Sequence, residues 1–152
     1  MRVVLDSWAV LAWLQGEPPG AVVRDLIDAM AGDGEAHRRA RRALRMRLEA
    51  LQVAISVVNL GEVYYLVGRR AGEREAKAVV AGLRGLGVQV LPVDEPVVLA
   101  AASLKVRYPV AYADAFAAAA ARSAAGVLVT GDTELARVKE IRIAWIGPGP
   151  RP

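Results

Sequence analysis

The chain has 152 residues, of which 55% are hydrophobic and 24% are charged, and its formal net charge at pH 7 is +4. This composition predicts one folded domain with a sizeable core and excludes a disordered chain, and the absence of cysteine excludes disulfide bonds and thiolate metal sites. Since no apolar run reaches the roughly 18 residues of a membrane span and the first residues carry no signal-peptide pattern, we expect a cytoplasmic protein without membrane association.

The first strand and the first two helices are predicted from short apolar runs. The segment RVVLD at 2–6 is apolar without alternation, which is typical of a buried strand in a parallel sheet. Ser7 is a good N-cap residue, so we expect it to cap a helix that runs to Leu14. A second helix is expected from about Gly20 to Met30, before a glycine-rich turn.

Residues 35–50, EAHRRARRALRMRLEA, form the most charged stretch of the chain. At about 100° per residue, apolar side chains share one face and arginines share an opposite arc, which predicts an amphipathic helix. The apolar set is Ala40, Leu44, Leu48 and Leu51, and the basic stripe is Arg38, Arg41, Arg42 and Arg45. The stripe is either an ordinary solvated face or an RNA- or partner-binding surface.

The rest of the chain alternates strands with helices. Strands are expected at 53–56, 88–93, 126–132 and 141–146, and helices at about 58–69, 71–86, 95–106 (capped by Asp94) and 111–124. This alternation predicts an α/β domain whose parallel sheet is covered by helices on both faces. We expect one domain over 1–147, with 35–50 as a basic helical insertion, and an exposed tail at 148–152.

Four carboxylates stand alone in apolar surroundings: Asp6, Glu62, Asp114 and Asp132. Buried carboxylates are costly to desolvate and are rarely left without a partner, yet apart from Arg2 no Lys or Arg lies in their immediate stretches. Asp6 and Asp132 follow predicted strands, where the polar chemistry of a parallel sheet collects. If the fold brings the four together, they form one site.

Each carboxylate also has an ordinary structural interpretation. Asp6 is a possible helix cap, and a long side chain such as Glu62 can reach solvent. Asp114 lies in the first turn of a predicted helix, where the helix dipole favours negative charge. Asp132 follows a glycine, and Asp is a common turn residue. These interpretations stay open alongside a shared site.

A divalent cation is the natural counter-charge for such a cluster, because carboxylates held together otherwise raise one another's pKa. Oxygen ligands without cysteine suit Mg²⁺ or Mn²⁺, which can activate a bound water for attack on a phosphodiester. The only histidine, His37, lies in the basic stretch, which excludes a histidine-centred triad or zinc site. The excess of basic over acidic residues, 20 to 16, suits a polyanion such as nucleic acid, although solubility explains it equally well.

Four segments together resemble the successive motifs of PIN-domain ribonucleases, and most closely those of VapC-type toxins from type II toxin–antitoxin modules. The segments are LDSWAVLAWL, SVVNLGEVYYLV, ADAFAAAAA and LVTGDTEL, and the resemblance runs from Met1 to about Ile146. It implies a three-layer αβα domain with a five-stranded parallel sheet. It also implies an endoribonuclease that depends on Mg²⁺ or Mn²⁺, acts as a toxin on RNA, forms a homodimer and is silenced by a small antitoxin.

The motif match also assigns expected roles to single residues. It implies that Asp6, Glu62 and Asp114 bind metal and act in catalysis, and that Asp132 completes the acidic quartet. Hydrogen bonds from Ser7 and Thr130 would support the site, and Asn59, on the Glu62 side of its helix, is a further candidate support. Some family members carry a second acid near the fourth motif, where this chain has Glu134.

Two other functions remain open. The chain is alternatively a PIN-like RNA-binding or scaffold protein with weak or no nuclease activity, using the arginines between 38 and 47; dispersed acids, or a salt bridge on Glu62, would favour it. A phosphoacceptor receiver domain also places acids near strand ends. It requires paired acids at the first strand, whereas VVL precedes Asp6.

Overall fold

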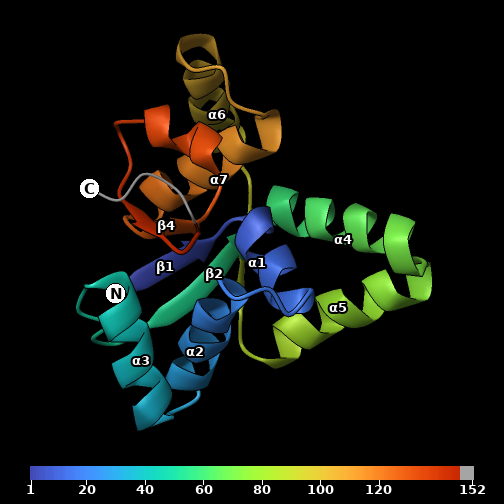
Figure 1. The fold of residues 1–152 in the computed structure, drawn as a ribbon. Coiled ribbons are helices and arrows are strands. Elements are labelled where there is room, and N and C mark those ends of the chain that lie inside the picture. Colours follow the sequence, from blue (N-terminus) through green and yellow to red (C-terminus); the bar gives the residue numbers. More distant parts are fainter. Residues whose placement is uncertain (148–152) are drawn as a thin grey trace.

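The apolar runs of the sequence form one parallel sheet (Figure 1), as seen in the computed structural model, which describes residues 1–147. The strand order is β3-β2-β1-β4-β5. The strands are β1 (Arg2–Leu5), β2 (Gln52–Ser56), β3 (Gln89–Leu91), β4 (Val127–Thr130) and β5 (Ile143–Trp145). All pairings are parallel. The tail expected at 148–152 lies outside the described residues.

Helices connect successive strands. They are α1 (Ser7–Leu14), α2 (Gly20–Met30), α3 (Gly34–Leu44), α4 (Val57–Ala71), α5 (Glu73–Gly85), α6 (Glu95–Arg107) and α7 (Tyr112–Ser123), with a short 3₁₀ helix η1 (Thr133–Arg137) between β4 and β5. The predicted α2 is confirmed at both ends. Asp94 caps α6 as expected, because its carboxylate accepts a hydrogen bond from the N–H of Val97 at 3.1 Å. No helix within residues 1–147 has the length and apolarity needed to cross a membrane.

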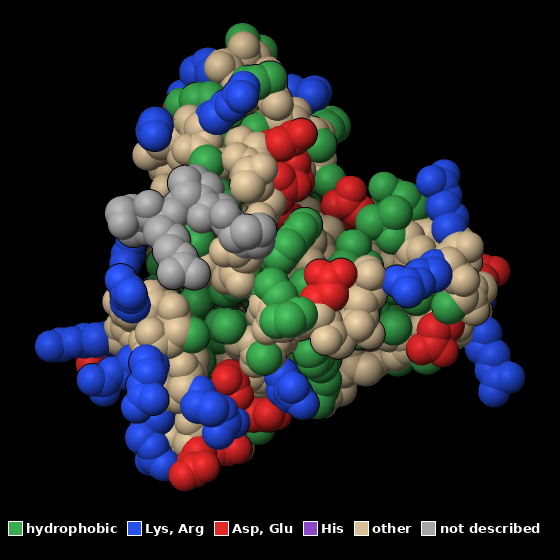
Figure 2. Space-filling model, in the orientation of Figure 1, with side chains coloured by type: hydrophobic (Ala, Val, Ile, Leu, Met, Phe, Trp, Pro, Cys, Tyr) green, Lys and Arg blue, Asp and Glu red, His purple; other side chains and the backbone are tan. Residues whose placement is uncertain are grey.

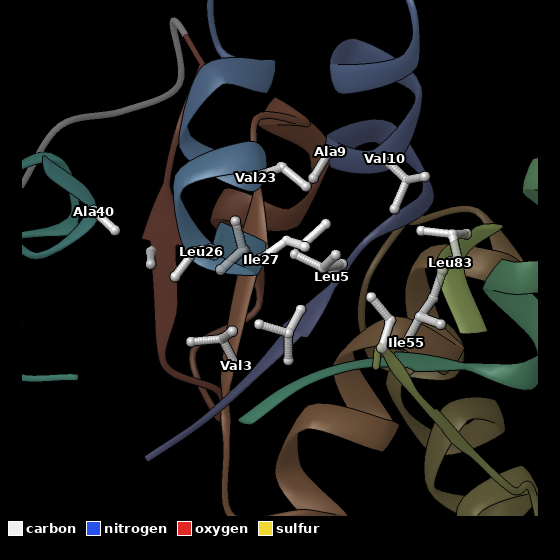
Figure 3. Packing of buried hydrophobic residues seen from close by; sticks show 14 of the residues in the cluster. Val3, Leu5, Ala9, Val10, Val23, Leu26, Ile27, Ala40, Ile55 and Leu83 are labelled. Carbon is white, nitrogen blue, oxygen red and sulfur yellow. The ribbon is translucent and has the colours of Figure 1, made fainter. Parts of the chain in front are cut away.

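Alternating side chains of the strands divide the core into two layers. Val3 and Leu5 of β1 pack with α1, α2 and α5 on one face (Figure 3), whereas Val4 packs with α6 and α7 on the other. The apolar runs of the strands are explained by this double burial, since both faces of the sheet are covered. The predicted three-layer α/β fold with a five-stranded parallel sheet is therefore confirmed.

The basic helix is shorter than predicted. It ends at Leu44, and Arg45 adopts a left-handed conformation with φ 52°. The N-terminal ammonium of Met1 takes hydrogen bonds to the carbonyls of Glu49 and Ala50, so this segment turns towards the start of β2 instead of continuing the helix. Leu48, which we expected on the apolar face of the helix, lies in the segment between α3 and β2, and its side chain is buried there.

A glycine at the start of α2 tests how closely this helix packs against α1. A Cβ on Gly20 would lie 2.3 Å from Cα of Trp13, so Gly20→Ala must shift backbone and should lower the free energy of unfolding by about 1–3 kcal/mol. Gly82 in α5 has open space around it, and Gly82→Ala should raise stability by up to about 1 kcal/mol. Urea denaturation of both variants checks the prediction, which is wrong if the two changes have the same sign.

Candidate active site

The first part of the site lies at the ends of the central strand β1 and its neighbour β4. Asp6 follows β1 directly, and Thr130 is the last residue of the neighbouring strand β4. The Thr130 hydroxyl donates to Oδ2 of Asp6 at 2.8 Å and accepts from the N–H of Asp132 at 3.0 Å. Because the N–H of Asp132 fills an acceptor position of this hydroxyl, the hydroxyl proton is directed to Asp6. The site therefore lies where the strand order reverses, because β2 and β3 are on one side of β1 and β4 and β5 are on the other.

Asp6 is buried with an incomplete set of hydrogen bonds. It is 1% exposed, and its Oδ1 has no hydrogen-bond partner among the described residues. The pKa of Asp6 is raised from 3.8 to about 7, mainly by burial and in part by the charges of Asp114 and Glu62, which together outweigh the hydrogen bonds from Thr130 and the Ser7 N–H. A buried carboxylate oxygen without a donor is chemically suited to bind a cation or a proton.

Two helices bring further carboxylates to the same neighbourhood. Asp114 lies in the first turn of α7 and is 8% exposed. Burial raises its pKa to about 6, with additional contributions from Asp132, Glu62 and Glu134. Glu62 lies on α4, is partly buried, and has only the Tyr65 hydroxyl near its Oε1, at 3.5 Å. Within residues 1–147, no salt bridge engages any of these acids.

Asn59 connects the elements that carry these acids. Its Nδ2 donates to the Ser7 hydroxyl and to the carbonyl of Ala113, each at 3.1 Å, and the Ser7 hydroxyl donates back to the Asn59 carbonyl at 3.3 Å. Ser7 follows Asp6, and Ala113 precedes Asp114. One fully buried amide therefore joins the start of α1, the helix of Glu62 and the start of α7.

The expected role of Ser7 as a helix cap is wrong. Ser7 is the first residue of α1, and Asp6 occupies the cap position without a capping hydrogen bond from its side chain. The physical reason is the bond between Ser7 and Asn59, which takes the hydroxyl away from the helix end. The serine of the LDSWAV motif is thus a link to α4 rather than the terminus of its own helix.

Asp132 has a structural contact as well as a place near the other acids. Its Oδ1 accepts from the N–H of Glu134 at 2.9 Å and so caps η1, which fits the expected turn role. Trp8 packs against this turn, because a Cβ on Gly131 would lie 2.3 Å from its ring. Sequence reasoning did not identify this packing, although the glycine before Asp132 is its signal. Glu134, two residues after Asp132, adds to the charge around Asp114.

The donor chemistry fits a hard divalent cation, although the carboxylates do not converge on one point. Oxygen atoms are the only donors, and the free Oδ1 of Asp6 lacks a positive partner. Yet within residues 1–147 no three His, Cys, Asp or Glu side chains lie close enough to hold a metal ion. Like charges repel one another at short range, and a bound cation would offset this repulsion. Asp6, Glu62, Asp114 and Asp132 would be the ligands of a cation here.

The predicted basic residues lie elsewhere. Arg38, Arg41 and Arg42 are on α3 and Arg45 follows it, and α3 packs against α2 rather than against the helices that carry Glu62 and Asp114. Figure 2 shows Lys and Arg side chains gathered at the lower left, where Figure 1 places α3. The acids and the basic stripe are therefore two separate features of the surface.

Comparisons with known proteins agree with this fold. A chain of the VapBC-1 structure from nontypeable Haemophilus influenzae matches with a TM-score of 0.67 and 16% identity, covering 96% of this chain and 98% of that one. DNA-bound VapBC from Salmonella typhimurium matches with a TM-score of 0.62 and 22% identity, covering 96% of this chain and 98% of that one. The sarcin–ricin-loop-cleaving toxin VapC20 from Mycobacterium tuberculosis matches with a TM-score of 0.58 and 24% identity, covering 92% of this chain and 98% of that one.

The match to a sequence family is more extensive than these identities suggest. No curated protein matches the chain significantly. A model of the PIN domain, however, matches residues 3–141, a range that begins inside β1, runs past β4 and includes all four carboxylates. The chain therefore belongs to the PIN-domain family.

Proposed function

We propose that this protein is a metal-dependent endoribonuclease and the toxin of a toxin–antitoxin pair. The observation that carries the proposal is Asp6, a buried carboxyl with one oxygen that has no hydrogen-bond partner among the described residues, and with a pKa raised to about 7 by burial and by the nearby charges of Asp114 and Glu62. A cation bound to these oxygens offsets their repulsion. In a PIN domain, such a cluster suits the hydrolysis of RNA phosphodiester bonds.

The structural neighbours support the toxin assignment. VapC20 is described as a toxin that cleaves the sarcin–ricin loop, and other neighbours are toxin–antitoxin complexes. By this likeness, RNA is the substrate, a small antitoxin is the inhibitor, and a homodimer is the working form. The alternative of a scaffold without activity is less well supported, because no salt bridge occupies Glu62 within the described chain and the acids share one neighbourhood.

In the proposed mechanism, Asp6, Glu62, Asp114 and Asp132 would hold Mg²⁺ or Mn²⁺. The chemistry such an ion would supply when bound is a water of lowered pKa and charge neutralisation at the phosphate. Thr130 holds Oδ2 of Asp6, which leaves Oδ1 free as a ligand. Ser7 and Asn59 fix α1, α4 and α7 relative to one another through hydrogen bonds, so that the acids at the starts of α1 and α7 and on α4 would keep their positions when a cation binds. The burial of Asp6 keeps bulk water from replacing these contacts.

Replacing Asp114 tests the nuclease assignment. Asp114→Asn removes one negative ligand from a nearly buried position and should lower RNA cleavage with Mn²⁺ by about a hundredfold or more, without unfolding the protein. Cleavage of a fluorescent RNA and circular dichroism measure the two effects. Asp28→Asn on α2 is the matched control and should cleave normally. Undiminished cleavage by the Asp114 variant would contradict the site.

Stability without metal should depend on pH in a defined direction. The pKa values of about 7 for Asp6 and about 6 for Asp114 exceed the ordinary 3.8, so the folded protein binds these protons more tightly than the unfolded chain. In EDTA, the free energy of unfolding should therefore fall as pH rises from about 4 to about 7, by an amount on the order of a few kcal/mol.

Two further arms make this pH test specific. Mn²⁺ should restore stability at pH 7, because it binds the ionised carboxylates of the folded state only. Asp6→Asn should flatten the pH dependence in EDTA, whereas Glu17→Gln, at an exposed position, should leave it unchanged. Melting temperatures between pH 4 and pH 8 measure all three proteins. A melting temperature that rises steadily over this range for the unaltered chain in EDTA would contradict the crowding of these acids.

Asn59 should act on metal affinity through the elements it joins. Asn59→Ala removes its side-chain hydrogen bonds, costs about 2 kcal/mol of stability and should weaken Mn²⁺ binding by about 10- to 100-fold. The control is Ser56→Ala, which removes the N-cap of the same helix at a cost of about 1 kcal/mol but touches no acid. Calorimetric Mn²⁺ titration separates the two variants; equal losses of affinity would assign Asn59 a general stabilising role.

A further inference from the structure

The α3 helix carries a group of exposed arginines that do not take part in its buried packing. Ala36 and Ala40 form its fully buried side, and Asp33 caps its start through the N–H groups of Glu35 and Ala36. These contacts are sufficient to place the helix. The arginines project from the other side, and all those from position 38 to position 47 are exposed.

Only part of this positive charge is neutralised by neighbouring acids. Arg38 pairs with Glu35 and Arg39 pairs with Asp25. Arg41, Arg42, Arg45 and Arg47 make no salt bridge within residues 1–147, and we call these four the α3 surface. Arg41 and Arg42 lie in the last turn of α3 and Arg45 follows it directly, so three like charges are concentrated at one helix end, where they repel one another. The attraction of cations to a helix C-terminus offsets this repulsion only in part.

The backbone at Arg45 supplies an independent observation. Arg45 has φ 52° and ψ 38°, a left-handed conformation that disfavours a residue with a Cβ. At the ends of α1, α2 and α5 the corresponding left-handed positions are taken by Gly16, Gly32 and Gly87, whereas Ala125 takes that position at the end of α7. A glycine at position 45 would relieve the strain at the end of α3. The arginine that stands there instead adds a third positive charge directly after the last turn of the helix.

A bound polyanion would relieve the repulsion among these arginines. The charge of the acidic site favours a nucleic acid as this polyanion. Without a cation, the carboxylates near Asp114 repel phosphate groups, so positive charge outside the acidic site adds to the affinity for a nucleic acid. Guanidinium groups form paired hydrogen bonds with phosphate oxygens. A cavity of about 560 Å³ beside Arg42 and Arg45 also presents Trp145 and Ile143 of β5, which offer an apolar surface for unpaired bases.

We propose that the α3 surface binds the sugar–phosphate backbone of a single-stranded part of the RNA substrate, at a distance from the bond that is cleaved. This inference rests on the proposed nuclease function for the identity of the ligand. The surface then sets which RNAs bind well: those with an unpaired segment long enough to occupy α3 as well as the acidic site. Short RNAs bind at the acidic site alone and gain nothing from α3.

The binding test uses the full chain carrying Asp114→Asn, so that RNA is not cut, with a fluorescent 20-nucleotide RNA in EDTA. The variant Arg41→Gln/Arg42→Gln/Arg45→Gln is compared with Arg70→Gln/Arg74→Gln/Arg84→Gln, three exposed arginines of α4 and α5 without salt bridges in the described chain. The α3 variant should lose about tenfold or more in affinity at 0.15 M salt, and its salt slope should shrink by about 2. The RNA affinity of the control should change less than twofold, because the control loses the same net charge as the α3 variant but at a different part of the surface.

Arg45→Gly separates binding from folding. It should raise the melting temperature, because glycine tolerates the left-handed backbone, and at the same time weaken RNA binding about threefold. A variant that is more stable yet binds less tightly cannot owe its loss to misfolding. Equal losses in the α3 variant and the control, unchanged affinity in the α3 variant, or preferred binding of duplex RNA would each overturn the proposal.

The cleavage arm distinguishes this inference from the proposed nuclease function. With Asp114 restored and Mn²⁺ present, the α3 variant should cleave a tetranucleotide as well as the unaltered chain does, and the 20-nucleotide RNA about tenfold less well. If no RNA is cleaved by any variant, the nuclease proposal fails while the binding result still stands on its own. If the α3 variant binds RNA normally but loses binding to polyglutamate, the surface belongs to an acidic protein and the RNA assignment is wrong.

Discussion

The desolvation of one carboxyl group, that of Asp6, governs the organisation of this molecule. A parallel sheet needs both of its faces covered, and the end of its central strand is therefore a place where water is scarce. Asp6 sits there with one oxygen bonded to Thr130 and the other without a partner. The acids on α4 and α7 add negative charge near this carboxyl, the Asn59 amide joins the elements that carry them, and no salt bridge within residues 1–147 neutralises Asp6.

This arrangement separates two electrostatic tasks between two parts of the surface. The acidic site gathers negative charge, which suits a cation and disfavours a phosphate. The α3 surface gathers positive charge on the exposed side of an element that packs mainly against α2. In the proposed function, chemistry and substrate affinity are thus carried by different segments, each with its own dependence on salt and on divalent ions.

The sequence predicted most of the fold, because local signals determine most of it. The start and end of α2 follow from its glycines and its apolar period, and the strands follow from apolar runs that only a doubly covered sheet can bury. The end of α3 was not predictable in the same way, because it depends on the Met1 ammonium taking the Glu49 and Ala50 carbonyls. Likewise Ser7 is a sound cap by type, and only a contact with Asn59, far away in the chain, explains its actual use.

The acids were found from their isolation in apolar segments, but their relations to one another were not. Nothing local indicates that Asn59 reaches the carbonyl before Asp114, or that Trp8 packs on the glycine before Asp132. The same distance along the chain has a consequence for synthesis. The bond between Thr130 and Asp6 spans 124 residues, and α7 is also made late. During translation, a nascent chain that lacks β4 also lacks Thr130 and Asp132, so the site that we propose is complete only after β4 has been made.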